Sequence, residues 1–344
     1  MSPTQKALIV TEVGKPVKLV EDWSIPEPTA KQIQLKVKVA GINPHDQKAR
    51  DWGLFIAEKL PALITNDVVG TVTKLGEGVT GIAVGDRVVT QPGFSPGWTQ
   101  NGVQEYATAD VGAFGKIPDT TSDDEAATLP TNIIAPLVAL FDTLKIPAPW
   151  TGQAFDYAGT TLLIVGGGSN CGRFGVQLAK LAGIGRIVVV GGKEAELKDL
   201  GATHVIDRHG GQDAVLARIR DVVGDDLVYA YDAINPVEGQ VLALNALSSS
   251  KKGALARLIP IGSVDESKVV GKAAGFEVRN VFGSSHIHPE LAGGFWERLP
   301  GFLETGKIRP TAYVVKQGLT AENVNEVLDA YRDGKAVTKT HIHL

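Results

Sequence analysis

A run of small residues in the middle of the chain is of the type that binds phosphate through its backbone. Gly166-Gly167-Gly168-Ser169-Asn170-Cys171-Gly172 follows an apolar run, residues 160–165, and precedes a helical pattern at 173–182. Residues without a Cβ let the backbone approach a pyrophosphate, and a helix N-terminus offers free N–H groups and the positive end of its dipole. In this strand–loop–helix context the run predicts a dinucleotide site, and the alternative is a tight turn without a ligand. We assign to the cofactor Gly166, Gly167, Gly168, Ser169, Asn170 and Cys171.

The end of the next apolar run indicates which dinucleotide binds. After Val190, where NAD-binding proteins carry an acidic residue for the ribose 2′-hydroxyl, the chain reads Gly191-Gly192-Lys193. No carboxylate there would repel a 2′-phosphate, and Lys193 would neutralise one, so NADPH is favoured over NADH. The alternative is that Lys193 is a solvated lysine at a helix start. We assign to the same cofactor Gly191, Gly192, Lys193, Ile261, Gly262 and Phe282.

Metal-binding and redox-active residue types are sparse. The chain has one cysteine, so it forms no internal disulfide and supplies no multi-thiolate metal site. That cysteine, Cys171, is interpreted as a small residue in the glycine-rich turn rather than as a reactive thiol. The pairs His286/His288 and His341/His343 would each share one face of a strand, but the sequence shows no third ligand near either. No metal site is predicted.

The elements expected around the glycine-rich loop differ along the chain. Residues 7–10, 32–39 and 68–75 read as short strands punctuated by Gly and Pro, which predicts a small β-barrel or sandwich. After a helical stretch from 121 to about 144, strands and helices alternate. Strands are expected at 160–165, 186–190, 204–206, 227–232 and 256–261, and helices at 173–182, 194–200, 212–223, 237–247, 295–304 and 320–333. This alternation predicts a doubly wound parallel sheet covered by helices.

Length and charge exclude several classes of protein. A chain of 344 residues predicts about two domains. With 34 basic and 38 acidic residues, the net charge of −4 offers no basic surface for a nucleic-acid partner. No apolar run reaches the ~20 residues of a membrane span, so no membrane partner is expected. The first residues contain no apolar leader, and we expect a cytoplasmic protein.

Motifs spread over nearly the whole chain resemble the medium-chain dehydrogenase/reductase superfamily. They are Gly41-Ile42-Asn43-Pro44-His45-Asp46, Val69-Gly70-Thr71-Val72, Gly76-Glu77-Gly78-Val79, Val84-Gly85-Asp86-Arg87-Val88, the glycine-rich loop and Leu200-Gly201-Ala202. The resemblance implies an α/β protein of two domains. A GroES-like β-barrel substrate domain would span 1–128 and be completed by 284–344, and a Rossmann NADPH-binding domain would span 129–283.

The metal-binding positions of that superfamily are altered in this chain. The positions that hold catalytic zinc in the alcohol dehydrogenases look like Asn43, Asn66-Asp67 and the neighbourhood of Pro130, and none of these is Cys or His. The segment that would hold structural zinc, Gln91–Tyr106, contains no cysteine. The chain therefore resembles the zinc-free branch of quinone, enoyl and alkenal double-bond reductases.

Within that branch, three segments resemble the trans-acting enoyl reductases of fungal polyketide clusters: Asn43–Lys48, Asp51–Ile56 and His288–Trp296. Two features depart from those relatives. They usually carry Gly at or near Thr65, and the segment Gly191-Gly192-Lys193 is shorter than usual.

The resemblance implies reduction of an activated C=C bond without zinc. Hydride adds to the β-carbon, and protein donors must stabilise the charge on the conjugated oxygen and protonate the α-carbon. Lys48 matches an active-site lysine of the enoyl reductases, and its alternative is a surface lysine. Asn43 orients a carboxamide or carbonyl, or caps a turn, and Thr131 is expected beside the nicotinamide. Asp46 and Asp67 are interpreted as hydrogen-bonding structure, and Trp52, Phe55, Trp98 and His286 are assigned to the substrate.

The expected activity is NADPH-dependent reduction of an enone, quinone or enoyl thioester in secondary metabolism. One alternative is a carbonyl reductase or alcohol dehydrogenase that works without metal. Another is a cofactor-binding biosynthetic partner with little turnover. The expected partner is a small-molecule substrate, free or as a carrier-bound thioester. Monomer and homodimer both remain open.

Overall fold

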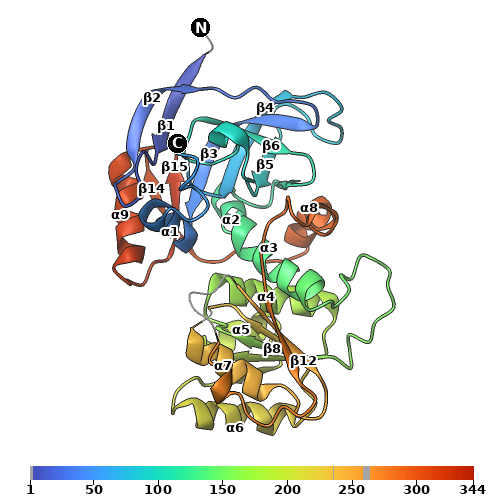
Figure 1. The fold of residues 1–344 in the computed structure, drawn as a ribbon. Coiled ribbons are helices and arrows are strands. Elements are labelled where there is room, and N and C mark those ends of the chain that lie inside the picture. The colour runs from blue at the N-terminus through green and yellow to red at the C-terminus, as the bar shows by residue number, and fades with distance from the viewer. Residues whose placement is uncertain (1–2, 235, 259–263) are drawn as a thin grey trace. The chain divides into compact units, whose positions relative to one another are not determined.

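The chain folds into two units that alternate along the sequence. The computed structural model describes residues 3–234, 236–258 and 264–344. Unit 1 comprises Met1–Thr131, Ala292–Gly306 and Pro310–Leu344, and unit 2 comprises Asn132–Leu291 and Lys307–Arg309. Three separate stretches of chain therefore build unit 1. Figure 1 shows the elements of both units.

Unit 2 contains a six-stranded sheet in which every pairing is parallel, in the order β10-β9-β8-β11-β12-β13. The order reverses beside β8, which is the switch point where doubly wound sheets bind ligands. The predicted parallel sheet is confirmed. Its strands are β8 (Thr161–Val165), β9 (Arg186–Val190), β10 (His204–Ile206), β11 (Tyr229–Asp232), β12 (Gly253–Arg257) and β13 (Phe276–Asn280).

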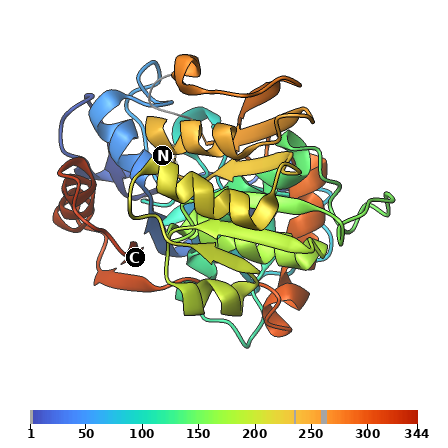
Figure 2. The same cartoon turned by 90° about the horizontal axis from the view of Figure 1, so that it is seen from below.

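Helices cover both faces of this sheet. Alternate strand residues point to opposite faces, and the buried side chains on each face pack against helices. Leu163 and Val188 belong to a buried cluster with side chains of α6 and α7. Ile164 and Tyr231 point to the other face, where Gly175 of α4 lies close to both. Figure 2 shows the strands side by side with helices alongside. The helices are α4 (Asn170–Ala182), α5 (Glu194–Leu200), α6 (Gln212–Val223) and α7 (Val237–Ala246).

The structure differs from two of the elements expected from the sequence. The strand expected at 256–261 is β12, which starts at Gly253, because small buried residues give little apolar signal. Ile261 and Gly262, which we assigned to the cofactor, lie outside the described residues. The helical stretch expected to 144 is divided into α2 (Asp123–Ala127), α3 (Pro130–Val138) and a π-helical turn (Ala139–Thr143).

Unit 1 is β-rich, as predicted. Its main sheet follows the path β14-β15-β3-β4-β5-β7, with β6 beside β3, and a separate pair joins β1 and β2. The strands are β1 (Thr4–Ile9), β2 (Lys18–Ser24), β3 (Gln32–Ile42), β4 (Asp67–Leu75), β5 (Arg87–Thr90), β6 (Tyr106–Asp110), β7 (Phe114–Lys116), β14 (Tyr313–Gln317) and β15 (Lys339–His343). Alternating burial along β3 follows its alternating sequence, so one face packs on a core.

The last strand of the chain lies inside this sheet. β15 pairs antiparallel with β3, with Thr340 opposite Ile42, and parallel with β14 on its other side. The pairing brings residue 339 to the end of β3, where α1 begins. Further helices of unit 1 are α1 (Pro44–Trp52), α9 (Ala321–Arg332) and most of α8 (Pro289–Glu304), whose first three residues belong to unit 2. No helix in the described part of the chain is long and apolar enough to cross a membrane.

Candidate active site

The glycine-rich loop joins β8 to α4 and is held by the side chain of Ser169. The Ser169 hydroxyl donates to the Gly166 carbonyl at 2.9 Å and accepts from the Gly172 N–H at 3.0 Å, which caps α4. Gly166 has φ of +87°, a conformation that favours glycine. A Cβ at Gly172 would lie 2.3 Å from the Gly166 carbonyl oxygen, and one at Gly167 would lie 2.2 Å from Val189 Cγ1. The fold therefore requires glycine at these positions.

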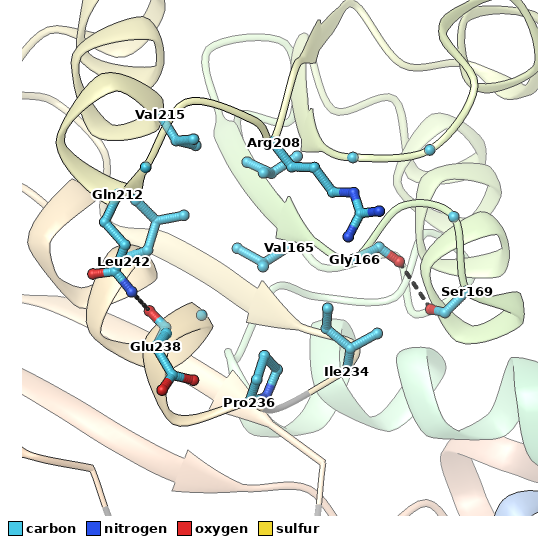
Figure 3. Close-up of a pocket in the computed structure, with 16 residues that line it drawn as sticks. Val165, Gly166, Ser169, Arg208, Gln212, Val215, Ile234, Pro236, Glu238 and Leu242 are labelled. Carbon is cyan, nitrogen blue, oxygen red and sulfur yellow. Dashed lines mark hydrogen bonds between the residues drawn. The ribbon is translucent and has the colours of Figure 1, made fainter. Parts of the chain in front are cut away.

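A cavity of about 580 Å³ opens beside this loop at the carboxyl ends of the strands. Figure 3 shows the side chains that line it. The loop contributes Gly166, Gly168 and Ser169, and the end of β9 contributes Gly191 and Gly192. The segments after β10 and β11 and the starts of α6 and α7 form the rest, including Arg208, Gln212, Ile234, Pro236, Glu238 and Leu242. The cavity thus lies at the switch point of the sheet.

The basic group in this cavity is Arg208, which sequence reasoning missed. Arg208 follows β10 by two residues, and its guanidinium points toward the loop at Gly166 and Ser169 in Figure 3. Lys193 occupies the N-cap position of α5 without a side-chain capping hydrogen bond, and it is not among the residues that line the cavity. The signal was present in the sequence, because residues just after the third strand of such a sheet reach the same edge as the loop.

Four of the other residues assigned to the cofactor, Gly167, Asn170, Cys171 and Phe282, are not among those that line the cavity. Asn170 and Cys171 form the first turn of α4, and the Cys171 Sγ lies 4.0 Å from Asn132 Oδ1. Gly167 packs against Val189. Phe282, half-buried, follows β13.

In unit 1, Asn43 and Asp67 share a buried lysine, Lys339. The Lys339 ammonium donates to Asn43 Oδ1 at 2.9 Å and forms an ion pair with Asp67 Oδ2. Asn43 Nδ2 donates to the same Asp67 oxygen at 2.7 Å. Side-chain exposure is 1% for Lys339 and 0% for Asp67, so water does not screen the pair. The lysine comes from β15, and no local pattern connects it with Asn43 or Asp67.

Asp67 also fixes the start of α3. Its Oδ1 accepts the Thr131 backbone N–H at 2.7 Å. Burial raises the pKa of Asp67, but Lys339 and the hydrogen bonds outweigh this and hold the pKa below its usual value. The Thr131 hydroxyl oxygen is buried and has no hydrogen-bond partner in the described ranges of the chain.

Asn43 stands before α1, the helix that carries Lys48. The Asn43 backbone N–H donates to Asp46 Oδ2 at 2.8 Å, and Asp46 Oδ1 accepts the Thr65 N–H at 2.8 Å. Asp46 and Asp67 thus lie in hydrogen-bonding networks. Lys48 is half-buried, and burial lowers the pKa of its ammonium. Thr65 has φ of +71°, which explains why glycine suits this position.

The aromatic residues assigned to the substrate fall in different surroundings. Trp98 is buried, and its Nε1 donates to the Lys59 carbonyl at 3.1 Å. The same residue is among those that line a second cavity, of about 460 Å³. The ring centroid of Phe55 lies 5.2 Å from that of Phe94, and Phe94 also lines the second cavity. Trp52 is 61% exposed and lines neither cavity. His286 belongs to unit 2.

The pair His341/His343 meets an acidic partner that the sequence did not reveal. Asp124 Oδ1 lies 2.9 Å from His341 Nδ1 and 2.9 Å from His343 Nε2, and the His341 ring stacks on Tyr313. Within the described ranges, no group of three His, Cys, Asp or Glu side chains is arranged to hold a metal ion.

We expect His341 to make stability fall on mild acidification. Burial and, next, the nearby Lys339 lower the pKa of His341 to about 4, although Asp124 opposes this. In the unfolded chain this histidine is protonated near its usual pKa of about 6.5, whereas in the folded protein it is protonated only near pH 4. The free energy of unfolding therefore declines as the pH falls from about 6.5 to about 4. One such group contributes at most about 1.4 kcal/mol per pH unit. Urea unfolding between pH 7 and 4.5 measures it.

In His341→Gln that slope should become shallower, whereas His204→Gln, at an exposed histidine, should retain it. An unchanged slope in His341→Gln would show that other groups cause the acid sensitivity.

Comparison with known proteins places the chain in a family. Residues 29–136 match the alcohol dehydrogenase GroES-like domain. The chain is 33% identical over 269 residues to the trans-enoyl reductase tazE of Aspergillus terreus, covering 75% of this chain and 86% of tazE. It is 30% identical over 332 residues to the trans-enoyl reductase ACTTS2 of Alternaria alternata, covering 92% of each chain.

Solved structures share the fold. The CurK enoyl reductase superposes with a TM-score of 0.76 at 20% identity, over 98% of this chain and 99% of that one. The mycobacterial Rv1454c, solved with NADPH, superposes with a TM-score of 0.72 at 23% identity, over 99% of this chain and 100% of that one. With these likenesses, the parallel sheet and the glycine-rich loop at its switch point, the chain belongs to the medium-chain dehydrogenase/reductase superfamily, in the branch of the fungal trans-enoyl reductases.

Proposed function

We propose that this oxidoreductase uses NADPH to reduce the activated C=C bond of an enone or enoyl thioester, without zinc. Unit 2 binds the cofactor, and unit 1 carries the groups that act on the substrate. The observation that carries the proposal is the pair of networks around Asn43 and Asp67, which fix the helix bearing Lys48 and the start of α3, which bears Thr131. The trans-enoyl reductase relatives support the same substrate class.

The residues that match the catalytic zinc positions of the alcohol dehydrogenases do not fit zinc. Asn43 and Asp67 present an amide oxygen and a carboxylate, and both are already bound to the Lys339 ammonium. Zinc in proteins prefers thiolate, imidazole and carboxylate ligands in a tetrahedral set. A positive charge fixed among the donors would repel a divalent cation. A carbonyl in the substrate must therefore be polarised by protein donors.

Lys48 is the donor that we propose for this step. NADPH, when bound, supplies the hydride that adds to the β-carbon of the substrate. The Lys48 ammonium stabilises the charge that develops on the conjugated oxygen, since a desolvated cation interacts more strongly with an anion than a hydrated one. The Thr131 hydroxyl is a second donor, and Lys48 or water protonates the α-carbon.

Oxidation of NADPH, followed by its absorbance, tests the proposal against a substrate panel. Enones and enoyl thioesters should be reduced at least about tenfold faster than saturated aldehydes and ketones, with EDTA causing no loss. Turnover of saturated carbonyls alone would instead indicate a carbonyl reductase. Tight NADPH binding without turnover on any member would indicate a cofactor-binding partner, and inactivation by EDTA would contradict zinc independence.

Arg208, in place of Lys193, is proposed to bind the 2′-phosphate of NADPH. The guanidinium enters the cavity beside Gly191 and Gly192, where no acidic residue lines the end of β9. Arg208→Ala should raise the Kd of NADPH about 10- to 100-fold, because a charge-assisted hydrogen bond contributes about 1.5–3 kcal/mol. The Kd of NADH should change by less than about threefold.

Lys193→Ala is the matched comparison. If it weakens NADPH binding and Arg208→Ala does not, the lysine is the phosphate ligand that the sequence predicted. Fluorescence titration with both cofactors gives the four dissociation constants.

A further inference from the structure

The buried cation Lys339 links two segments that carry the groups proposed to act on the substrate. Lys339 Nζ contacts Asn43 Oδ1 and Asp67 Oδ2, and Asn43 Nδ2 closes a triangle with Asp67. Asn43 directly precedes α1, which bears Lys48, and the other oxygen of Asp67 accepts the Thr131 N–H. One ammonium therefore orients two residues, and through them the starts of two helices.

The protein backbone is shaped around this ammonium. A Cβ at Gly41 would lie 3.0 Å from Asp67 Cβ, from Lys339 Cε and from Lys339 Nζ. Gly41 lies opposite His341 in the β3–β15 pairing, which aligns residue 339 with the end of β3. The lysine thus fills a space that only glycine leaves open. A buried ion pair often adds little net stability compared with apolar packing, so stability alone does not explain why a lysine occupies position 339.

We propose that Lys339 is a positioning residue for catalysis. Through Asn43 and Asp67 it holds in place α1, which bears Lys48, and the start of α3, which bears Thr131. The inference rests on the proposed function, because Lys48 and Thr131 are its donors. Loss of the ammonium removes one of the hydrogen bonds that orient the Asn43 carboxamide and leaves the Asp67 carboxylate without its cation. Both segments then sample positions from which the donors reach the substrate oxygen less often, and the rate falls although the donors remain.

The variant pair Lys339→Met and Lys339→Met/Asp67→Asn separates this role from simple charge neutralisation. The single variant buries an unpaired carboxylate, and its melting temperature should fall by about 10 °C or more. The double variant removes both charges, and the melting temperature should largely return. Neutralisation alone would restore the rate together with stability. Positioning predicts that kcat of the folded double variant stays at least about tenfold below the wild type, with the Kd of NADPH within about twofold.

Amide hydrogen exchange supplies a readout that does not need turnover. In the double variant, exchange should accelerate at least about tenfold at the Thr131 amide and at residues 43–48, and remain unchanged in α6 of unit 2. Lys335→Met, at an exposed lysine four residues earlier, is the matched control and should alter neither rate nor exchange.

The outcomes assign failure to one proposal or the other. Recovery of kcat together with stability in the double variant overturns the positioning role, as does unchanged exchange at Thr131. A wild-type protein that binds NADPH but reduces no enone overturns the proposed function, and hydrogen exchange then decides the role of Lys339 by itself. If the double variant fails to recover its melting temperature, exchange measured on Lys339→Met below its melting temperature decides the same question.

Discussion

Replacing Gly172 by alanine should raise the Kd of NADPH at least 100-fold, a loss of about 3 kcal/mol. The added Cβ would lie 2.3 Å from the Gly166 carbonyl oxygen and 2.9 Å from Gly167 Cα, both backbone atoms that no side-chain rotation can move away. The loop must shift, and the N–H groups at the start of α4 then no longer converge on the pyrophosphate. Calorimetric titration with NADPH measures the loss.

Gly301→Ala is the control for the general effect of alanine in a helix. Gly301 lies in α8 with nothing within 4 Å of its added Cβ, so this variant should bind NADPH normally and gain up to about 1 kcal/mol of stability. If Gly172→Ala binds NADPH within threefold of the wild type, the glycine-rich loop does not form the phosphate site that we propose.

Replacing Lys48 by methionine should lower kcat for enone reduction about 100-fold or more, with the Kd of NADPH little changed. Methionine keeps the apolar stem of the half-buried side chain and removes only the charge and its protons. Steady-state rates across a pH series measure the effect. Because burial lowers the pKa of Lys48 below 10.5, the wild-type rate should fall on the alkaline side at a pH below that value. The variant should lack this limb.

Lys36→Met, at an exposed lysine of β3, is the matched control and should change neither kcat nor the pH profile. If Lys48→Met retains wild-type kcat, the donor to the conjugated oxygen lies elsewhere, and the Thr131 hydroxyl becomes the first alternative.

The parts of the site that sequence could predict are those built from one continuous segment. The run from Gly166 to Gly172 carries its strand, turn and helix start together, so composition and order were sufficient to predict its backbone. Lys48 and Asn43 were assigned to the site through the resemblance of a motif only six residues long. Arg208 was missed because the prediction of the cofactor used the end of the second strand and not that of the third, although both ends line one cavity.

The partners of the buried charges could not be predicted, because tertiary pairing decides them. Lys339 lies 272 residues from Asp67 along the chain and meets it only through the register of β15 on β3. Asp124 is separated from His341 by 217 residues. For Trp98, no sequence pattern distinguishes a core side chain from a substrate contact, and in the structure this side chain belongs mostly to the core.

The place of β15 in the sheet sets an order for the folding of a nascent chain. Ribosomes deliver the segments in sequence, so unit 2 has all its residues once Arg309 has been added. At that stage β15, which pairs with β3, has not been translated. Lys339, the cation that pairs with Asp67 beside Gly41, is also missing. Unit 2 can therefore fold first, while unit 1 remains incomplete until residues 339–343 have been translated.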